Sequence, residues 1–133
     1  MRKKTMRSTI SILLLLGVLM ANLVTAQAAQ IGPMYIGISQ LASTLSISSS
    51  GGASCNGRVA VLNGYKADLT VELKQDGATI KTWTSSGSGT ISAGGTYYVA
   101  SGHSYYVTST AKVYNSSGTL VESPSKDSPS SSY

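Results

Sequence analysis

The chain has 133 residues, a formal net charge of +5 and a single cysteine. Four of its ten basic residues lie within the first seven positions, so the part from residue 29 onward carries six bases and five acids, a net charge of +1. These six bases are scattered, which argues against nucleic-acid binding, because that requires a clustered basic surface. One cysteine excludes an intramolecular disulfide, so the core alone must stabilise the fold.

Residues 1–28 have the features of a secretory signal peptide. The positively charged residues 1–7 precede an apolar run from Ile12 to Ala21, and Ala26-Gln27-Ala28 is a small-residue cleavage pattern. The apolar run is well short of the ~20 residues that span a bilayer. We therefore expect cleavage after Ala28, a secreted, extracellular product and no stable membrane anchor.

The remaining chain, about 105 residues, is long enough for one domain. Residues 29–42 are a leader that forms either a loose arm or an edge strand, and the sequence leaves both open. Residues 41–50 and 53–62 alternate apolar and polar positions, which predicts two strands. Residues 66–75 alternate most regularly, and their outward positions carry charges of both signs, typical of surface charge pairing.

The fourth predicted strand, residues 79–84, contains an irregularity. Ile80 and Trp83 have opposite parity, so either a β-bulge intervenes or Trp83 points outward. Residues 90–100 predict a fifth strand, which Gly94-Gly95 interrupts.

Residues 102–123 predict a hairpin of two further strands. Alternating aromatic and β-branched residues run to Tyr114, and Asn115-Ser116-Ser117-Gly118 is a turn signal. Residues 124–133 are rich in Ser and Pro, which predicts a flexible tail. No helical periodicity follows the signal peptide, so we expect an all-β fold with a single seven-stranded antiparallel sandwich in residues 43–123.

The pattern Gly102-x-x-Tyr105-x-Val107-x-x-x-Ala111 resembles the sixth strand of fibronectin type III and immunoglobulin-like domains. In those families a tyrosine near the start of this strand hydrogen-bonds back to the preceding corner. The resemblance implies this structural role for Tyr105. Val107 stands where antibody domains have a cysteine, so the resemblance is to the sandwich architecture and not to antibody domains.

Further motifs are spread along the chain: Leu45-Ser46-Ile47-Ser48, Ile80-Lys81-Thr82-Trp83, Ser86-Gly87-Ser88-Gly89, Tyr97-Tyr98-Val99 and Ala111-Lys112-Val113-Tyr114-Asn115-Ser116-Ser117-Gly118. Together they resemble a group of short secreted proteins from Gram-positive bacteria that have no characterised function. This resemblance implies export and a β fold. It implies no activity and no site residues.

Residues that could carry catalysis are few. His103 is the single histidine, it lies at a turn-to-strand junction, and no Gly-x-Ser-x-Gly motif occurs. One Cys and one His cannot form a structural zinc site, and no calcium-loop pattern is present. Cys55 shares its parity with Val59 and Val61, which predicts a buried core thiol instead of a nucleophile. We expect no enzyme activity, no metal and no cofactor.

Tyrosine is the residue type that most suggests a binding function, with eight tyrosines and no phenylalanine in the chain. Flat rings with a polar tip serve the recognition of extracellular sugars and proteins. The alternation of the strands places Tyr98, Tyr106 and Tyr114 on outer faces. Trp83 is a further candidate binding residue. Eight residues of strand separate Tyr106 from Tyr114, about 26 Å, a span that suits a chain better than one sugar ring. Alternatively, these tyrosines only cover strand surfaces.

The sequence thus predicts a secreted, non-enzymatic binding or interaction domain at the cell envelope or in the extracellular space. Its expected partner is an extracellular glycan or protein. A secreted antimicrobial or toxin-like protein is the second hypothesis, and a small secreted hydrolase that depends on His103 is the third. The oligomeric state and the ligand stay open.

Overall fold

The computed structural model describes residues 35–133, which form an all-β structure of antiparallel strands. The predicted signal peptide, residues 1–28, lies outside the described residues, as does the leader up to residue 34. No helix in the described part of the chain is long and apolar enough to cross a membrane. The strands are β1 (Ile38–Ile47), β2 (Gly52–Val61), β3 (Lys66–Gln75), β4 (Ala78–Gly87), β5 (Thr90–Tyr98), β6 (Ser104–Tyr114), β7 (Leu120–Glu122), β8 (Ser125–Asp127) and β9 (Ser131–Ser132).

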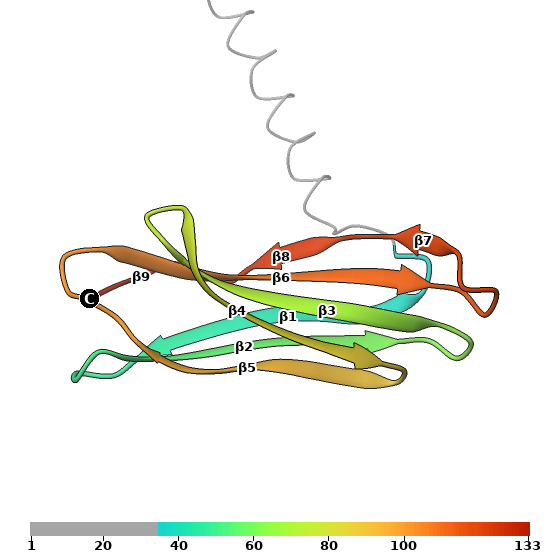
Figure 1. Ribbon diagram of the computed structural model, residues 1–133, viewed down its shortest axis with the longest axis horizontal. Coiled ribbons are helices and arrows are strands. Elements are labelled where there is room, and N and C mark those ends of the chain that lie inside the picture. Colours follow the sequence, from blue (N-terminus) through green and yellow to red (C-terminus); the bar gives the residue numbers. More distant parts are fainter. Residues whose placement is uncertain (1–34) are drawn as a thin grey trace, which may run out of the picture. The chain divides into compact units, whose positions relative to one another are not determined.

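The strands form two sheets that face each other in a β-sandwich-like arrangement (Figure 1). The three-stranded sheet has the order β1-β2-β5. The six-stranded sheet has the order β4-β3-β6-β7, and β8 and β9 also pair with β6. The strands β3 and β6 therefore lie in the middle of their sheet, while β1, β4 and β5 are edge strands.

Alternation along β3 determines which of its side chains enter the core. Ala67, Leu69, Val71 and Leu73 are at most 1% exposed, and the intervening polar residues lie on the outer face of the sheet. Each buried Leu or Val contributes about 1.5–3 kcal/mol relative to an exposed one. The prediction of a strand over residues 66–75 is confirmed with the same boundaries.

The prediction of seven strands is wrong, because the described residues contain nine. The additional strands β8 and β9 lie in residues 124–133, for which composition predicts a flexible tail. The backbone of this segment pairs with β6, and the buried Ser128 hydroxyl accepts a hydrogen bond from the Val107 amide at 2.9 Å. The Tyr133 hydroxyl donates to the Ser49 carbonyl at 3.1 Å. Composition does not reveal such backbone pairing.

A β-bulge resolves the irregular parity of β4. Leu73 pairs with Lys81 but Lys74 pairs with Thr79, so Ile80 is an extra residue on β4. Both Ile80 and Trp83 consequently pack against the core. The strands β4 and β5 also continue through Ser85-Ser86 and Gly94-Gly95, where the sequence predicts a connection and an interruption.

The centre of the core contains a small polar cluster that joins the two sheets. The hydroxyl of Ser43 on β1 lies 2.6 Å from that of Ser109 on β6 and donates to the Lys126 carbonyl, also at 2.6 Å. Ser109 is fully buried and Ser43 is 9% exposed. A Cβ atom on Gly57 of β2 would collide with Ser109 Oγ and with Val71, so the sheets approach closely because residue 57 is glycine.

The first described residues are held by a carboxylate. Glu122 on β7 accepts hydrogen bonds from the backbone amides of Ile36 and Gly37, at 3.0 and 2.7 Å. From residue 38 the chain continues directly into β1, at the edge of the three-stranded sheet. The described part of the leader is therefore a short anchored segment followed by an edge strand.

Candidate functional site

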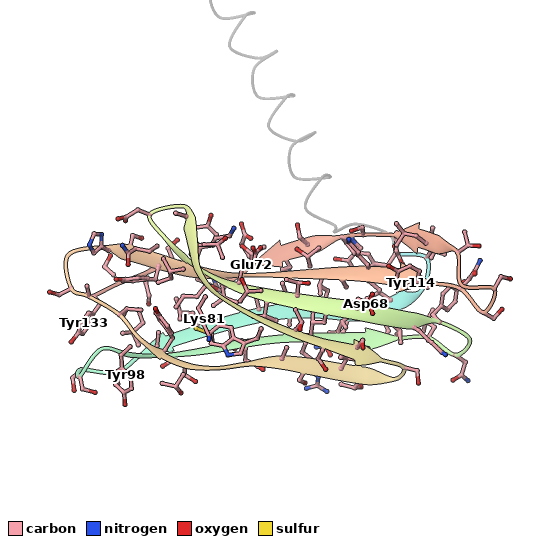
Figure 2. All side chains as sticks on the ribbon, in the orientation of Figure 1. Asp68, Glu72, Lys81, Tyr98, Tyr114 and Tyr133 are labelled. Carbon is pink, nitrogen blue, oxygen red and sulfur yellow. The ribbon has the colours of Figure 1, made fainter. Side chains whose placement is uncertain are left out.

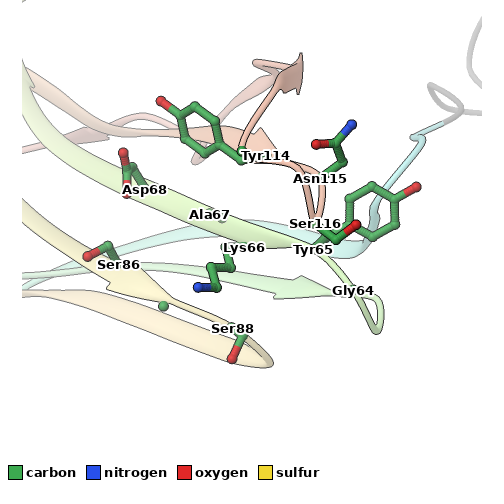
Figure 3. A pocket seen from close by; sticks show the side chains of 12 residues that line it. Gly64, Tyr65, Lys66, Ala67, Asp68, Ser86, Ser88, Tyr114, Asn115 and Ser116 are labelled. Atoms are coloured by element: carbon green, nitrogen blue, oxygen red, sulfur yellow. The ribbon is translucent and has the colours of Figure 1, made fainter.

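A groove of about 750 Å³ opens on the outer face of the six-stranded sheet (Figure 3). Residues 66–68 of β3 form its floor, and residues 86–88 at the end of β4 form one side. Tyr114 and the turn 115–118 form the opposite side, and Gly64-Tyr65 closes the end. We call this the tyrosine groove. Its volume lies within the range of about 300–1,000 Å³ typical of ligand sites.

Strand register brings the side chains of the groove together. Lys66 on β3 pairs with Tyr114 on β6, and Asp68 pairs with Ser86 on β4 and with Lys112 on β6. Directly opposite residues on one face of a sheet have Cβ atoms about 4.5–5.5 Å apart. The two middle strands thus place an aromatic ring, an ammonium and a carboxylate beside each other on one rigid surface.

The turn after Tyr114 is fixed by its own hydrogen bonds. The Asn115 side-chain oxygen accepts from the Ser117 and Thr119 amides, each at 3.0 Å. The Gly118 amide donates to the Asn115 carbonyl at 2.9 Å, and Gly118 has the positive φ of +83° that this turn requires. Because the Asn115 oxygen is used in the turn, its NH₂ group is the part available to a ligand.

Tyr65 is held at the end of the groove by a close contact with the backbone. A Cβ atom at Gly37 would lie 2.6 Å from Tyr65 Cδ1, so the ring rests directly on this glycine. Tyr65 is half-buried and packs against the core, while Gly64 before it takes a φ of +88° in the Asn63-Gly64 turn. The ring therefore has a defined orientation without any ligand.

The charged groups of the groove are exposed and unpaired. Within residues 35–133, the ion pairs are Lys74 with Glu72 and His103 with Asp76, so neither Lys66 nor Asp68 belongs to one. The groove therefore offers one carboxylate acceptor and one ammonium donor, and the exposed Lys112 lies opposite Asp68 at its margin. Surface charge pairing, the interpretation that the sequence favours for this strand, applies to Lys74 and Glu72.

The structure does not gather the four predicted binding residues into one site. Tyr114 lines the tyrosine groove, whereas Tyr106 lies on the same face opposite Lys74, outside the groove. Tyr98 belongs to the three-stranded sheet and is 71% exposed. Tyr98 and Tyr114 lie toward opposite ends of the sandwich (Figure 2).

Trp83 is half-buried at the side of the sandwich where β4 and β5 run close together. A Cβ atom at Gly95 of β5 would lie 2.9 Å from its indole nitrogen, so the ring rests on this glycine of the other sheet. Lys81 Nζ lies 5.9 Å from the ring centroid. These contacts give Trp83 a packing role between the sheets.

The two residues predicted to be structural are both buried. The Tyr105 hydroxyl donates to the Ala100 carbonyl at 2.5 Å, which ties the start of β6 to the preceding corner. Cys55 is 3% exposed, and burial raises the pKa of its thiol to about 11. A thiol with this pKa is protonated at neutral pH and is a poor nucleophile.

His103 is bound to Asp76 in the β3–β4 turn. His103 Nδ1 lies 2.6 Å from Asp76 Oδ2, and Asp76 Oδ1 accepts from the Ser104 amide at 3.1 Å. The hydrogen bond from Ser104 and the His103 contact lower the pKa of Asp76. Within residues 35–133, no hydroxyl or thiol is hydrogen-bonded to His103, and no group of three His, Cys, Asp or Glu side chains could hold a metal ion.

The groove contains residues that sequence reasoning did not select, chiefly Tyr65, Lys66 and Asp68. The outward parity of Lys66 and Asp68 was visible, but the register that sets Lys66 opposite Tyr114 depends on the non-local pairing of β3 with β6. Tyr65 could have been found from its position directly after the strong Asn63-Gly64 turn signal.

No protein-family model matches the sequence, and a comparison with curated protein sequences finds no significant match. The resemblance to short secreted proteins of Gram-positive bacteria therefore stays a prediction.

Proposed function

We propose that this protein is a secreted, non-enzymatic binding module that holds a glycan in the tyrosine groove. The observation that carries the proposal is the position of the Tyr114 ring beside the unpaired side chains of Lys66 and Asp68. An aromatic face covers the apolar face of a sugar ring, while fixed polar groups bind its hydroxyls.

The polar groups of the groove suit an uncharged, hydroxyl-rich ligand. A sugar hydroxyl both donates and accepts, and the groove supplies the Asp68 carboxylate as acceptor and the Lys66 ammonium as donor. The hydroxyls of Ser86 and Ser88 can do either. Lys66 and Lys112 flank the single carboxylate of Asp68, so this face carries charges of both signs with one excess positive charge. This is not the extended surface of one sign that attracts a charged polymer.

The fold and the predicted export favour a role in recognition outside the cell. The strands β3, β6 and β7 are neighbours in one sheet, as the third, sixth and seventh strands are in immunoglobulin-like domains. Together with the hydrogen bond from Tyr105 to the corner, this order favours the finer assignment to the immunoglobulin and fibronectin type III architecture. Residues 1–28, as a cleaved signal peptide, would deliver the domain to the extracellular space or the cell envelope.

Two observations favour binding without catalysis. Cys55 is a buried thiol with a raised pKa, and His103 is engaged by Asp76 at an exposed turn. Neither residue lines the tyrosine groove. A site that positions a ring, a carboxylate and an ammonium without a nucleophile–base pair is suited to holding a ligand.

The test is retention of residues 29–133 on isolated cell wall, cellulose, chitin, xylan and mucin. Wild-type protein and Tyr106→Ala should be retained on at least one of these matrices, and Tyr114→Ala should bind about tenfold more weakly. Tyr106 is the matched control, because it lies on the same strand and face but outside the groove.

Three outcomes would contradict the proposal. If the wild type is retained on none of the matrices, the proposal of a glycan ligand is wrong. Growth inhibition of other bacteria by the purified protein would then favour the antimicrobial hypothesis. Retention on mucin that survives removal of its sugars would indicate a protein partner. Retention that falls steeply with salt would indicate a charged polymer instead of a neutral glycan.

A further inference from the structure

A second hollow adjoins the tyrosine groove on the outer face of the six-stranded sheet. It has a volume of about 470 Å³ and lies over β3 and β4, where Thr70 and Thr84 form a cross-strand pair. Asp68 and Ser86 line both hollows. The two hollows therefore meet at the Asp68–Ser86 pair and form one continuous track.

The length of the track exceeds one sugar ring. From Lys66 in the tyrosine groove to Thr70 in the second hollow, the chain advances four residues along β3. At the rise of an extended strand this is about 13 Å. A single ring stacked on Tyr114 would leave the Thr70–Thr84 end of the track empty.

The threonines of this face fall into two groups. The Thr108 hydroxyl donates to the Asp127 carboxylate at 2.7 Å, and the Thr79 hydroxyl bonds with Glu72 at 3.2 Å. By contrast, no side-chain hydrogen bond within residues 35–133 involves the hydroxyl of Thr70 or Thr84. Among the described residues, Thr82 and Thr110 on the same face also make no side-chain hydrogen bond, but they line neither hollow. Thr70 and Thr84 are thus the free hydroxyls that the second hollow presents to a ligand.

From these observations we infer that the ligand is a linear, uncharged polysaccharide that occupies at least two successive subsites. One sugar unit stacks on Tyr114, and the next lies over the Thr70–Thr84 pair, with Asp68 at the junction between them. This inference rests on the proposed function and adds to it the polymeric class of the ligand and the direction in which the chain runs, along β3.

The test measures affinity as a function of chain length. Fragments of one to six sugar units, cut from cellulose, chitin and xylan, are titrated calorimetrically into residues 29–133. Wild-type affinity for at least one series should rise by about fivefold or more between one unit and three or four, because a second unit adds the hydrogen bonds of the second hollow. It should then level off.

Thr70→Val removes the hydroxyl but keeps the β-branched shape, so the strand should remain intact. This variant should bind the single unit as the wild type does and lose most of the gain with chain length. Thr110→Val is the matched control, since Thr110 pairs with Thr70 on the same face but lines neither hollow. The melting temperature of each variant shows whether folding is preserved.

An affinity that is equal for one and six units, or a chain-length gain that Thr70→Val leaves unchanged, would overturn the extended site. The proposed function would survive this result if Tyr114→Ala still weakened retention on the polysaccharide while Tyr106→Ala did not. Absence of retention of the wild type on every matrix would overturn both proposals.

Discussion

Two polar regions of this protein use their polar side chains in opposite ways. At the centre of the core, the Ser43 and Ser109 hydroxyls are buried and bonded to each other and to a backbone carbonyl. In the tyrosine groove, Lys66 and Asp68 are exposed and belong to no ion pair within residues 35–133. The core pair lies on the inner face of the six-stranded sheet, where Ser109 of β6 meets Ser43 of β1, and the groove lies on the outer face of the same sheet.

The comparison separates polar groups that stabilise the fold from those that are free to bind. No buried side-chain nitrogen or oxygen among the described residues lacks a partner, as expected from the cost of leaving one unsatisfied. Removing a core hydroxyl should therefore lower stability. Removing a groove side chain should leave stability unchanged and reduce binding.

The largest effect is expected at the close approach of the two sheets. Gly57→Ala places a methyl group against Ser109 Oγ and Val71, and this overpacking should lower the free energy of unfolding by roughly 1–3 kcal/mol. Urea denaturation of the variant and of Arg58→Ala, an exposed neighbour on β2, measures the difference. An unchanged midpoint for Gly57→Ala would mean that the sheets are not in close contact there.

A smaller effect is expected at Asp76, a polar group that is exposed yet partnered. Its pKa is lowered in the folded protein by the Ser104 amide and His103. Ionised Asp76 therefore stabilises the fold above its unfolded pKa of about 3.9, and this contribution is lost as the pH falls through that value toward the lower folded-state pKa. Asp76→Asn should lower the melting temperature by at most a few degrees near neutral pH.

The melting temperatures of wild type and Asp76→Asn should converge as the pH falls below about 3.9, because protonated Asp76 no longer differs in charge from Asn. Other carboxylates titrate in both proteins, so the difference isolates Asp76. If the difference in melting temperature between the two proteins stays constant as the pH falls, the charge of Asp76 contributes nothing to the stability of the fold. Retention on glycan should be the same for both proteins at neutral pH.

Much of the fold could be predicted from the sequence because most strands alternate with period two. Residues 66–75 and the part of β2 around Cys55 follow this pattern, and parity alone assigns Leu69, Val71 and Cys55 to the core. The bulge at Ile80 could be anticipated as one of two alternatives but not chosen, because it depends on pairing with Leu73 and Lys74. The strands β8 and β9 escaped prediction because their stability comes from pairing with β6 and not from their own residues.

The candidate site was harder to predict than the fold. Outward parity selected Tyr114, but it also selected Tyr98 and Tyr106. Tyr98 lies on the other sheet, and the register of β3 against β6 separates Tyr106 from Tyr114. The charges beside Tyr114 follow the same alternation as Glu72 and Lys74, which do pair. Glu72 and Lys74 pair along one strand, whereas Asp68 lies opposite Lys112 without forming an ion pair within residues 35–133. Alternation alone therefore does not predict which surface charges pair.

The most direct test of the account is Asp68→Asn, with melting temperature and glycan retention measured on the same preparation. This substitution keeps the size of the side chain and removes the charge that the groove offers to sugar hydroxyls. We predict an unchanged melting temperature and retention that falls by about tenfold, because hydrogen bonds to a charged acceptor are the stronger ones. A lowered melting temperature with unchanged retention would show that Asp68 stabilises the fold, and it would contradict the assignment of the groove as the binding site.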